Sequence, residues 1–198
     1  MVEYTPRRIK QNMVQRYLAM EELIIKEQAS TRQTLESDLL WREQTESDIP
    51  FASDLFIQHR WSEMLLIPAI TDEQRHSLLN QQAKLQQKYY KEKYPASEIL
   101  IIEHLGTRIA RLHIDRHNNS NWHIIDISLL PFLCGQGIGT AILNMVIKKA
   151  DQVGSPCSLY VRKDNPAKRL YQRLGFRVLP NPDLELDQFL IRPTTICI

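Results

Sequence analysis

The chain has 198 residues, 43% hydrophobic and 24% charged, which suits one soluble domain and leaves little room for a second. Its net charge of +2 and pI near 8.4 lack the strong basic surplus typical of nucleic-acid-binding proteins. The apolar runs are far shorter than a membrane span, and the first residues lack the apolar core of a signal peptide. We therefore expect a cytoplasmic protein without nucleic-acid or membrane partners.

The chain contains three cysteines, Cys134, Cys157 and Cys197. Their number is odd and their spacing fits no metal-ligand motif, so the sequence predicts neither a disulfide framework nor a zinc site. We expect free thiols and no bound metal.

Residues 1–34 are predicted to form an amphipathic helical extension outside the main domain. Apolar residues recur at steps of 4, 4, 3 and 4 from Ile9 to Ile24, which places them in one stripe along a helix. Basic residues crowd the beginning of this helix, where the helix dipole disfavours them, so packing has to hold it in place. We expect the stripe to dock on the rest of the chain or on a second copy in a homodimer. Docking to another partner or to a membrane surface is the alternative.

Residues 35–198 are predicted to form one domain, which begins with the short strand LLWRE. The side-chain oxygens of residues 45–48 suit a helix N-cap. The helix that follows is expected to carry Phe51, Leu55 and Phe56 inward.

A second N-cap signature, at Thr71, predicts a long polar helix that is ended by Pro95. Leu78, Leu85 and Tyr89 are the apolar residues of this helix that we expect to contact the core. Its glutamines and lysines are expected to face solvent.

The pattern changes from helical to strand-like at residue 98. Residues 98–104 and 108–116 read as a hairpin around the turn 105–107, and a polar turn leads into a third strand at residues 122–130. These segments predict an antiparallel meander.

Beyond the meander, the sequence alternates between helix and strand. It predicts a helix at residues 137–153, a strand at 158–162, a helix beginning at Asn165, and two final strands near residues 176–179 and 188–191. A strand, a crossover helix and a strand in succession imply a parallel pair. We therefore predict a mixed sheet in an α/β (α+β) domain.

Glycines occupy every second position, at Gly135, Gly137 and Gly139, between the third strand and the helix after it. A helix N-terminus offers unpartnered backbone N–H groups and a partial positive charge, and glycines let an anion approach that backbone closely. The segment has neither the G-x-G-x-x-G spacing of dinucleotide-binding folds nor the lysine of a P-loop. The sequence predicts an anion site that belongs to neither class.

Two motifs together carry a family resemblance. GQGIGT at residues 135–140 directly follows a strand, and NPAKRLYQRLGF at residues 165–176 comes one strand later. In this order they resemble the GNAT superfamily of acetyl-CoA-dependent N-acetyltransferases, over about residues 39–193. The resemblance implies a GNAT fold: a mixed central sheet with an antiparallel N-terminal meander, a splayed parallel pair and flanking helices. It also implies acetyl transfer from acetyl-CoA by direct attack of an amine, carried by either a small molecule or a protein or peptide.

The resemblance assigns acetyl-CoA-binding residues by motif position. The pantetheine arm would contact the backbone of Ile127, Ser128 and Leu129, between the splayed strands. The pyrophosphate would lie on the backbone N–H groups of Gly135, Gln136, Gly137, Ile138, Gly139 and Thr140.

The chain departs from the family pattern at two places. Cys134 stands where the family usually has Arg or Gln, so a charge-assisted bond to phosphate is lost and weaker CoA binding is expected. Asn165 would be the helix-opening asparagine that contributes to CoA binding. Its spacing to Tyr171 is six positions where many members have seven, which leaves Asp164 as an alternative.

The resemblance makes Tyr171 the general acid that protonates the departing thiolate. An amine with a pKa of about 10.4 is mostly protonated at neutral pH, so a base is also required. Asp126, on the strand beside the expected pantetheine, is our choice for this base, with Glu103 and His113 on the neighbouring hairpin as alternatives. Residues 59–70 are expected to shape the acceptor site, but their sequence does not identify the acceptor.

A non-catalytic acyl-CoA sensor or scaffold is the alternative function. Cys134 and the unassigned base favour it, and Tyr171 argues against it.

Overall fold

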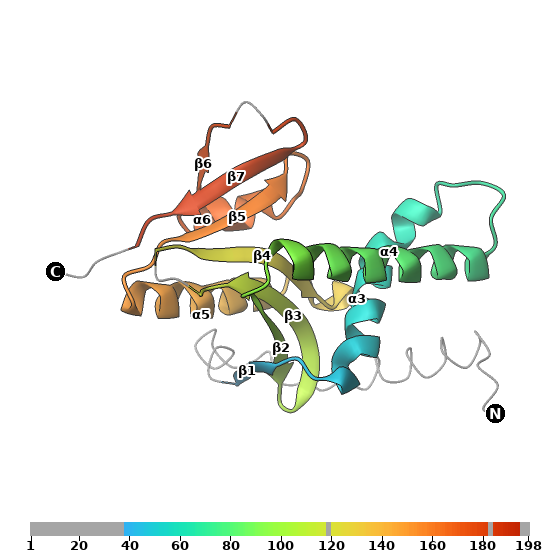
Figure 1. The fold of residues 1–198 in the computed structure, drawn as a ribbon, viewed down its shortest axis with the longest axis horizontal. Helices are drawn as coiled ribbons and strands as arrows, with labels where there is room; N and C mark the ends of the chain where they lie inside the picture. Colours follow the sequence, from blue (N-terminus) through green and yellow to red (C-terminus); the bar gives the residue numbers. More distant parts are fainter. Residues whose placement is uncertain (1–37, 118–119, 182–183, 195–198) are drawn as a thin grey trace. The chain divides into compact units, whose positions relative to one another are not determined.

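The computed structural model describes residues 38–117, 120–181 and 184–194, which form a seven-stranded sheet with flanking helices (Figure 1). The extension predicted at residues 1–34, its docking, and Cys197 lie outside the described residues. The strands are β1 (Leu39–Glu43), β2 (Glu98–His104), β3 (Thr107–Asp115), β4 (Trp122–Leu129), β5 (Cys157–Arg162), β6 (Arg177–Leu179) and β7 (Asp187–Arg192). The α-helices are α3 (Ile49–Met64), α4 (Asp72–Lys93), α5 (Ile138–Gln152) and α6 (Lys168–Arg173), and short 3-10 turns span Glu46–Asp48 and Pro131–Leu133.

The sheet has the strand order β1-β2-β3-β4-β5-β7-β6. Every pairing is antiparallel except that between β4 and β5, which α5 connects. The predicted meander and mixed sheet are therefore confirmed.

The parallel pair β4 and β5 is short. Its register joins Trp122, His123 and Ile124 to Cys157, Ser158 and Leu159. Beyond Ile124 the two strands diverge, while β4 stays paired to β3 as far as Leu129. This divergence is the splay that the family resemblance implies.

Helix α4 begins at the predicted cap. Thr71 Oγ1 accepts a hydrogen bond from the Gln74 backbone N–H at 3.2 Å, and the Thr71 N–H donates to Gln74 Oε1 at 2.7 Å. This reciprocal capping box satisfies two backbone donors at the start of the helix. No helix within the described residues is long and apolar enough to cross a membrane.

The predicted core face of α4 is wrong. Leu78, Leu85 and Tyr89 are 42%, 66% and 52% exposed, and the buried residues are instead Leu79 and Ala83. Neighbouring positions on a helix point 100° apart, and both sets recur at helical spacing. Periodicity alone therefore could not choose between the two faces.

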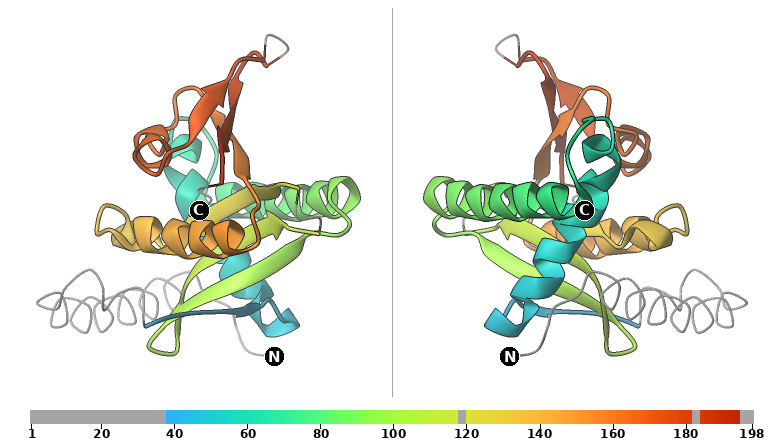
Figure 2. Two further views of the ribbon diagram at one scale, coloured as in Figure 1. Left: turned by 90° about the vertical axis from the view of Figure 1, so that its left-hand side faces the viewer. Right: turned by 90° about the vertical axis from the view of Figure 1, so that its right-hand side faces the viewer.

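Helices α4 and α5 lie on opposite sides of the sheet (Figure 2). In α5, Ile138, Ala141 and Ile142 are buried. On the other side, the ring of Tyr90 in α4 lies edge-on to the ring of His113, with 5.4 Å between their centroids. Because side chains alternate along a strand, Arg111 shares that face of β3 with His113.

Asp48, predicted only as part of a helix cap, has a completely buried side chain that accepts several hydrogen bonds. Arg42 of β1 donates to its carboxylate at 2.7 and 3.0 Å, and Arg108 of β3 donates at 3.1 Å. The backbone N–H of Thr45 adds a bond at 2.8 Å. The carboxylate thus joins two strands to the segment that starts α3.

Candidate functional site

The half of β4 beyond Ile124 has one edge without a strand partner. Leu130 donates its backbone N–H to Ile109 O at 2.9 Å, so its N–H points toward β3. Backbone groups alternate in direction along a strand, so those of Ser128 also face β3, while those of Ile127 and Leu129 face the open edge. The backbone of Ser128, which was predicted to contact the pantetheine arm, is therefore turned away from the open edge.

His59 of α3, the first residue of the segment 59–70 that was predicted to shape the acceptor site, reaches this open edge. Its Nε2 lies 2.7 Å from the backbone oxygen of Leu129. A carbonyl oxygen can only accept, so Nε2 must carry the hydrogen in this contact. His59 is recognised as a site residue only by its contact with Leu129, which lies 70 positions away in the sequence. A single histidine on a helix has no sequence pattern that predicts such a contact.

The predicted glycine segment forms the turn between β4 and α5. Gly135 and Gly137 have φ values of +83° and +88°, in the left-handed region that other residues rarely adopt. A Cβ atom at either position would meet no heavy atom within 4 Å. These two glycines are therefore required by backbone conformation and not by crowding.

The start of α5 presents backbone donors. Its first helical hydrogen bond runs from the Ala141 N–H to Gly137 O at 3.0 Å. The N–H groups that precede it cannot make helical bonds. They belong to Ile138, Gly139 and Thr140, three of the residues predicted to form the anion site.

Cys134 and Gln136 bring no charge to this turn. The Gln136 side chain donates to Phe132 O at 2.9 Å, and the Cys134 thiol donates to Leu130 O at 3.8 Å. Partial burial raises the pKa of the Cys134 thiol, which keeps it neutral. Any anion bound here would rely on backbone N–H groups.

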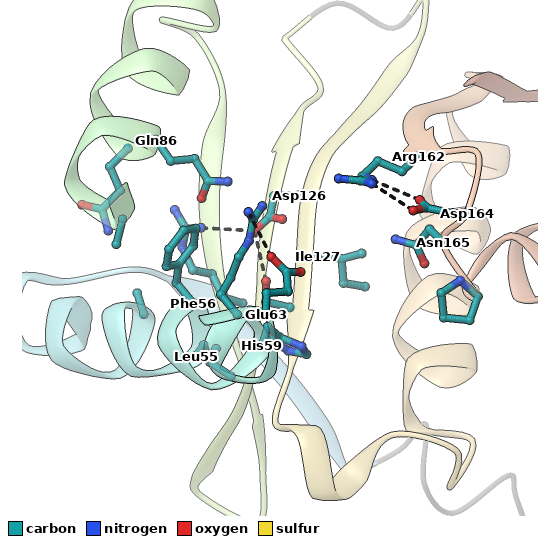
Figure 3. Close-up of a pocket in the computed structure, with 17 residues that line it drawn as sticks. Leu55, Phe56, His59, Glu63, Gln86, Asp126, Ile127, Arg162, Asp164 and Asn165 are labelled. Carbon is teal, nitrogen blue, oxygen red and sulfur yellow. Dashed lines mark hydrogen bonds and ion pairs between the residues drawn. The ribbon is translucent and has the colours of Figure 1, made fainter. Parts of the chain in front are cut away.

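A pocket of about 790 Å³ lies between α3, α4, β4 and the segment after β5 (Figure 3). Four predicted site residues line it: Asp126, Ile127, Ser128 and Asn165. Figure 3 shows Asp126 and Ile127 between the residues of α3 and α4 on one side and Arg162, Asp164 and Asn165 on the other. The glycine segment, Leu129 and Tyr171 are not among the lining residues. No group of three potential metal ligands occurs within the described part of the chain.

Asp126 lies in a small polar network on the floor of this pocket. Ser128 Oγ donates to its carboxylate at 3.2 Å, and Arg111 Nη1 lies 3.4 Å from the same oxygen. The Arg111 side chain is only 7% exposed, and its Nε donates to Gln44 Oε1 at 3.1 Å. Burial lowers the pKa of Arg111 and the charge of Asp126 opposes that shift. The sequence did not single out Arg111.

Tyr171 is buried on α6, against Phe176, with 5.8 Å between the ring centroids. Burial raises the pKa of its phenol to about 12, and the negative charge of Asp126 contributes in the same direction. The phenol therefore keeps its proton throughout the neutral range. A Cβ atom on Gly139 would lie 3.7 Å from the side chain of Leu170, so α6 adjoins the start of α5.

Asn165 caps the turn that leads into α6. Its Oδ1 accepts the Ala167 N–H at 2.8 Å, and its backbone oxygen accepts the Lys168 N–H at 3.2 Å. The neighbouring Asp164 accepts two hydrogen bonds from Arg162, at 3.0 and 2.9 Å. The helix was predicted to begin at Asn165, but α6 begins at Lys168 with Ala167 as its N-cap, so Asn165 caps the preceding turn and not the helix. Asp164 and Asn165 both border the pocket.

The alternative bases Glu103 and His113 do not line this pocket. Glu103 accepts a hydrogen bond from Arg42 at 2.9 Å. His113 is buried, its Nε2 lies 2.7 Å from Ser97 Oγ, and burial lowers its pKa to about 4. It lines a second cavity of about 350 Å³ beneath α4. Of the three candidates, Asp126 alone borders the main pocket.

The sequence matches the model of the acetyltransferase (GNAT) family over residues 58–176. Among solved structures, a PaiA N-acetyltransferase from Thermoplasma acidophilum, in complex with coenzyme A, has a TM-score of 0.57 and 17% identity, covering 78% of this chain and 98% of that chain. An acetyltransferase from Thermus thermophilus has a TM-score of 0.56 and 16% identity, covering 78% and 96%. The ribosomal-protein-S18-alanine N-acetyltransferase of Escherichia coli has a TM-score of 0.53 and 18% identity, covering 80% and 96%. No curated protein matches the sequence.

Proposed function

Because the chain belongs to the GNAT acetyltransferase family, we propose that it transfers the acetyl group of acetyl-CoA to an amine. The observation that carries the proposal is the open interior edge of β4, which leads along the chain into the glycine turn before α5. Three of the structural neighbours hold coenzyme A or acetyl-CoA. No described feature favours the non-catalytic alternative.

The described residues fit the two polar parts of acetyl-CoA. The amide groups of the pantetheine arm would bond to the backbone of Ile127 and Leu129, in the manner of an added strand. The pyrophosphate would accept from the N–H groups at the start of α5, where the helix dipole also favours an anion. The hydroxyl of Thr140, in the first turn of α5, and the side chain of Asn165, which lines the pocket, would add polar contacts to acetyl-CoA.

Acetyl-CoA supplies a thioester, so transfer forms a C–N bond to the amine, breaks the C–S bond, and releases a thiolate and one amine proton. Asp126 would accept that proton, because its carboxylate lines the pocket and is partly exposed. Tyr171 would donate its phenol proton to the thiolate. Exchange of a proton between the two side chains through solvent then restores both.

Acetyl-CoA is expected to raise the thermal stability of the protein. A ligand that binds only the folded state stabilises it by about 2.7 kcal/mol at a hundredfold excess over its Kd. Thermal unfolding should therefore shift upward with acetyl-CoA or CoA and stay unchanged with NAD. Transfer of the acetyl group to a panel of amines, detected as release of free CoA thiol, tests turnover. Stabilisation without any transfer would leave the non-catalytic alternative in its place.

Gly139→Ala is expected to stabilise the fold and weaken CoA binding at the same time. Gly139 has an ordinary helical conformation, and an added Cβ would make one van der Waals contact, at 3.7 Å to Leu170. Replacing a helical glycine with alanine gains roughly 0.5 kcal/mol or more. The same methyl group would stand between the backbone and a bound phosphate, so we expect CoA affinity to fall about tenfold by calorimetry.

Gly154→Ala, at the other end of α5, is the matched control. Gly154 has a φ of +69°, which alanine adopts only with strain of about 1 kcal/mol. This variant should be less stable than the wild type and bind CoA with unchanged affinity. Equal CoA affinity in both variants would argue against phosphate contact at Gly139.

A further inference from the structure

The charged residues around the main pocket form ion pairs of unequal burial. The Arg162–Asp164 pair and the Arg60–Glu63 pair are exposed at its rim. The Arg111–Asp126 pair lies on its floor, with side chains that are 7% and 26% exposed. Charge recognition is strongest where water is excluded, so the floor pair matters most for ligand choice.

The guanidinium of Arg111 has more hydrogen-bond donors than its described contacts use. A guanidinium carries five N–H groups, and it binds carboxylates best through two parallel hydrogen bonds. Here Nε is bound to Gln44, and Nη1 meets Asp126 only at 3.4 Å, a long contact. Within the described residues, Nη2 has no hydrogen-bond partner. A buried cation with one long ion pair is costly unless a further acceptor joins it.

The Arg111–Asp126 pair has no net charge, so it favours a ligand that also carries one positive and one negative charge. A dianion at Arg111 would meet the carboxylate of Asp126 a few ångströms away. A simple amine would pair with Asp126 and leave Arg111 as it is. A molecule with both an ammonium and a carboxylate would offer each of the two side chains its opposite charge.

We propose that the acetyl acceptor is an amine that carries a carboxylate within a few bonds of its nitrogen, such as a free amino acid. The carboxylate binds the outer N–H groups of Arg111, and the amine lies beside Asp126. Gln44 positions Arg111 through its bond to Nε. This inference rests on the proposed acetyl transfer and adds the chemical class of the acceptor.

The test compares each amino acid with its carboxamide as acceptor for the full-length protein. The pairs cover small, aliphatic, aromatic, acidic and basic side chains, and kcat/KM is measured from release of CoA thiol. The carboxamide has the less basic amine, so intrinsic reactivity at neutral pH favours it. We nevertheless expect the best amino acid to exceed its carboxamide by about 10- to 100-fold, the worth of a charge-assisted hydrogen bond.

Arg111→Gln is expected to remove this preference. It should lower kcat/KM for the amino acid more than for its carboxamide, so that the ratio of the two falls toward one, because the amide makes no ion pair with Arg111. Arg111→Lys, which keeps the charge without the fork, should retain part of the preference. Stabilisation by acetyl-CoA shows whether each variant is folded, and if Arg111→Gln is not, the wild-type comparison decides alone.

Two outcomes would overturn the inference, and they differ in what else they affect. If amino acids and carboxamides react equally well, the acceptor class is wrong and the proposed acetyl transfer stands. If no amine of either kind is acetylated although acetyl-CoA stabilises the protein, the proposed function fails and this inference fails with it.

Discussion

Tyr171→Phe is expected to lower kcat by about 100-fold or more and to leave CoA affinity unchanged. Phenylalanine fills the same buried space and keeps the ring contact with Phe176, so the change removes only the hydroxyl. Without a proton donor, the departing thiolate must take its proton from water. Steady-state kinetics with a good amine acceptor, together with calorimetric titration of CoA, separates the two quantities.

Tyr90→Phe is the matched comparison, because Tyr90 is the other phenol close to Asp126. Burial, together with the charge of Asp126, raises its pKa to about 12, as for Tyr171. Tyr90 lies on α4, on the opposite side of the sheet from α5, and we expect its variant to keep most of the activity. A large loss in Tyr90→Phe with none in Tyr171→Phe would reassign the acid. Since burial raises the pKa of both phenols to about 12, we expect wild-type activity to show no loss near pH 9 from ionisation of either phenol.

Asp48→Asn is expected to lower the free energy of unfolding by about 3 kcal/mol at pH 7, the lower end for breaking a buried ion pair. The side chain of Asp48 is fully buried and receives Arg42 and Arg108 from two strands. An amide cannot satisfy both cations. We expect a loss at the lower end of the range for buried ion pairs because the side chains of Arg42 and Arg108 are themselves 40% and 39% exposed. Urea unfolding at pH 7 measures the change.

This destabilisation should depend on pH in a definite direction. Hydrogen bonds from Arg42 and Thr45 hold the pKa of Asp48 well below its usual value, which is about 3.9 in an unfolded chain. A lowered pKa stabilises the folded state above about pH 4, and this contribution is lost as the pH falls further. The difference between wild type and Asp48→Asn should therefore be full at pH 7 and shrink below about pH 4.

Asp164→Asn gives the contrast, since Asp164 and Arg162 form an equally well-aligned pair on the surface. Exposed ion pairs contribute little to stability, so its unfolding midpoint should hardly move. If both aspartate variants unfolded alike, burial would not be the reason for the effect at Asp48.

The fold was largely predictable because its signals are local. The cap at Thr71 and the turn between β2 and β3 mark element boundaries, and the glycine turn follows from residue type. Gly135 and Gly137 occupy left-handed backbone, where glycine is preferred over other residues. The order of helices and strands then implies the mixed sheet.

The polar contacts were harder to predict because they depend on register. Arg111 is opposite Ser128, and it reaches Asp126 diagonally, beside an irregularity in the pairing of β3 with β4 after His113. No sequence pattern shows such a shift. Asp48 is similar, because its partners come from two strands that only the folded sheet brings together.

The three-residue pairing of β4 with β5 has a consequence for what can enter the sheet. Because β4 and β5 diverge after three paired residues, they enclose a wedge that is closed where the strands pair and widens away from that end. The strand at the border of a sheet can pair with a foreign polypeptide, whereas the open edge of β4 lies inside the sheet, between β3 and β5. A flexible chain with an amide every few bonds would fit this wedge from its wide end, up to the point where the strands meet. We therefore expect the point where β4 and β5 meet to limit how far such a ligand reaches between the strands.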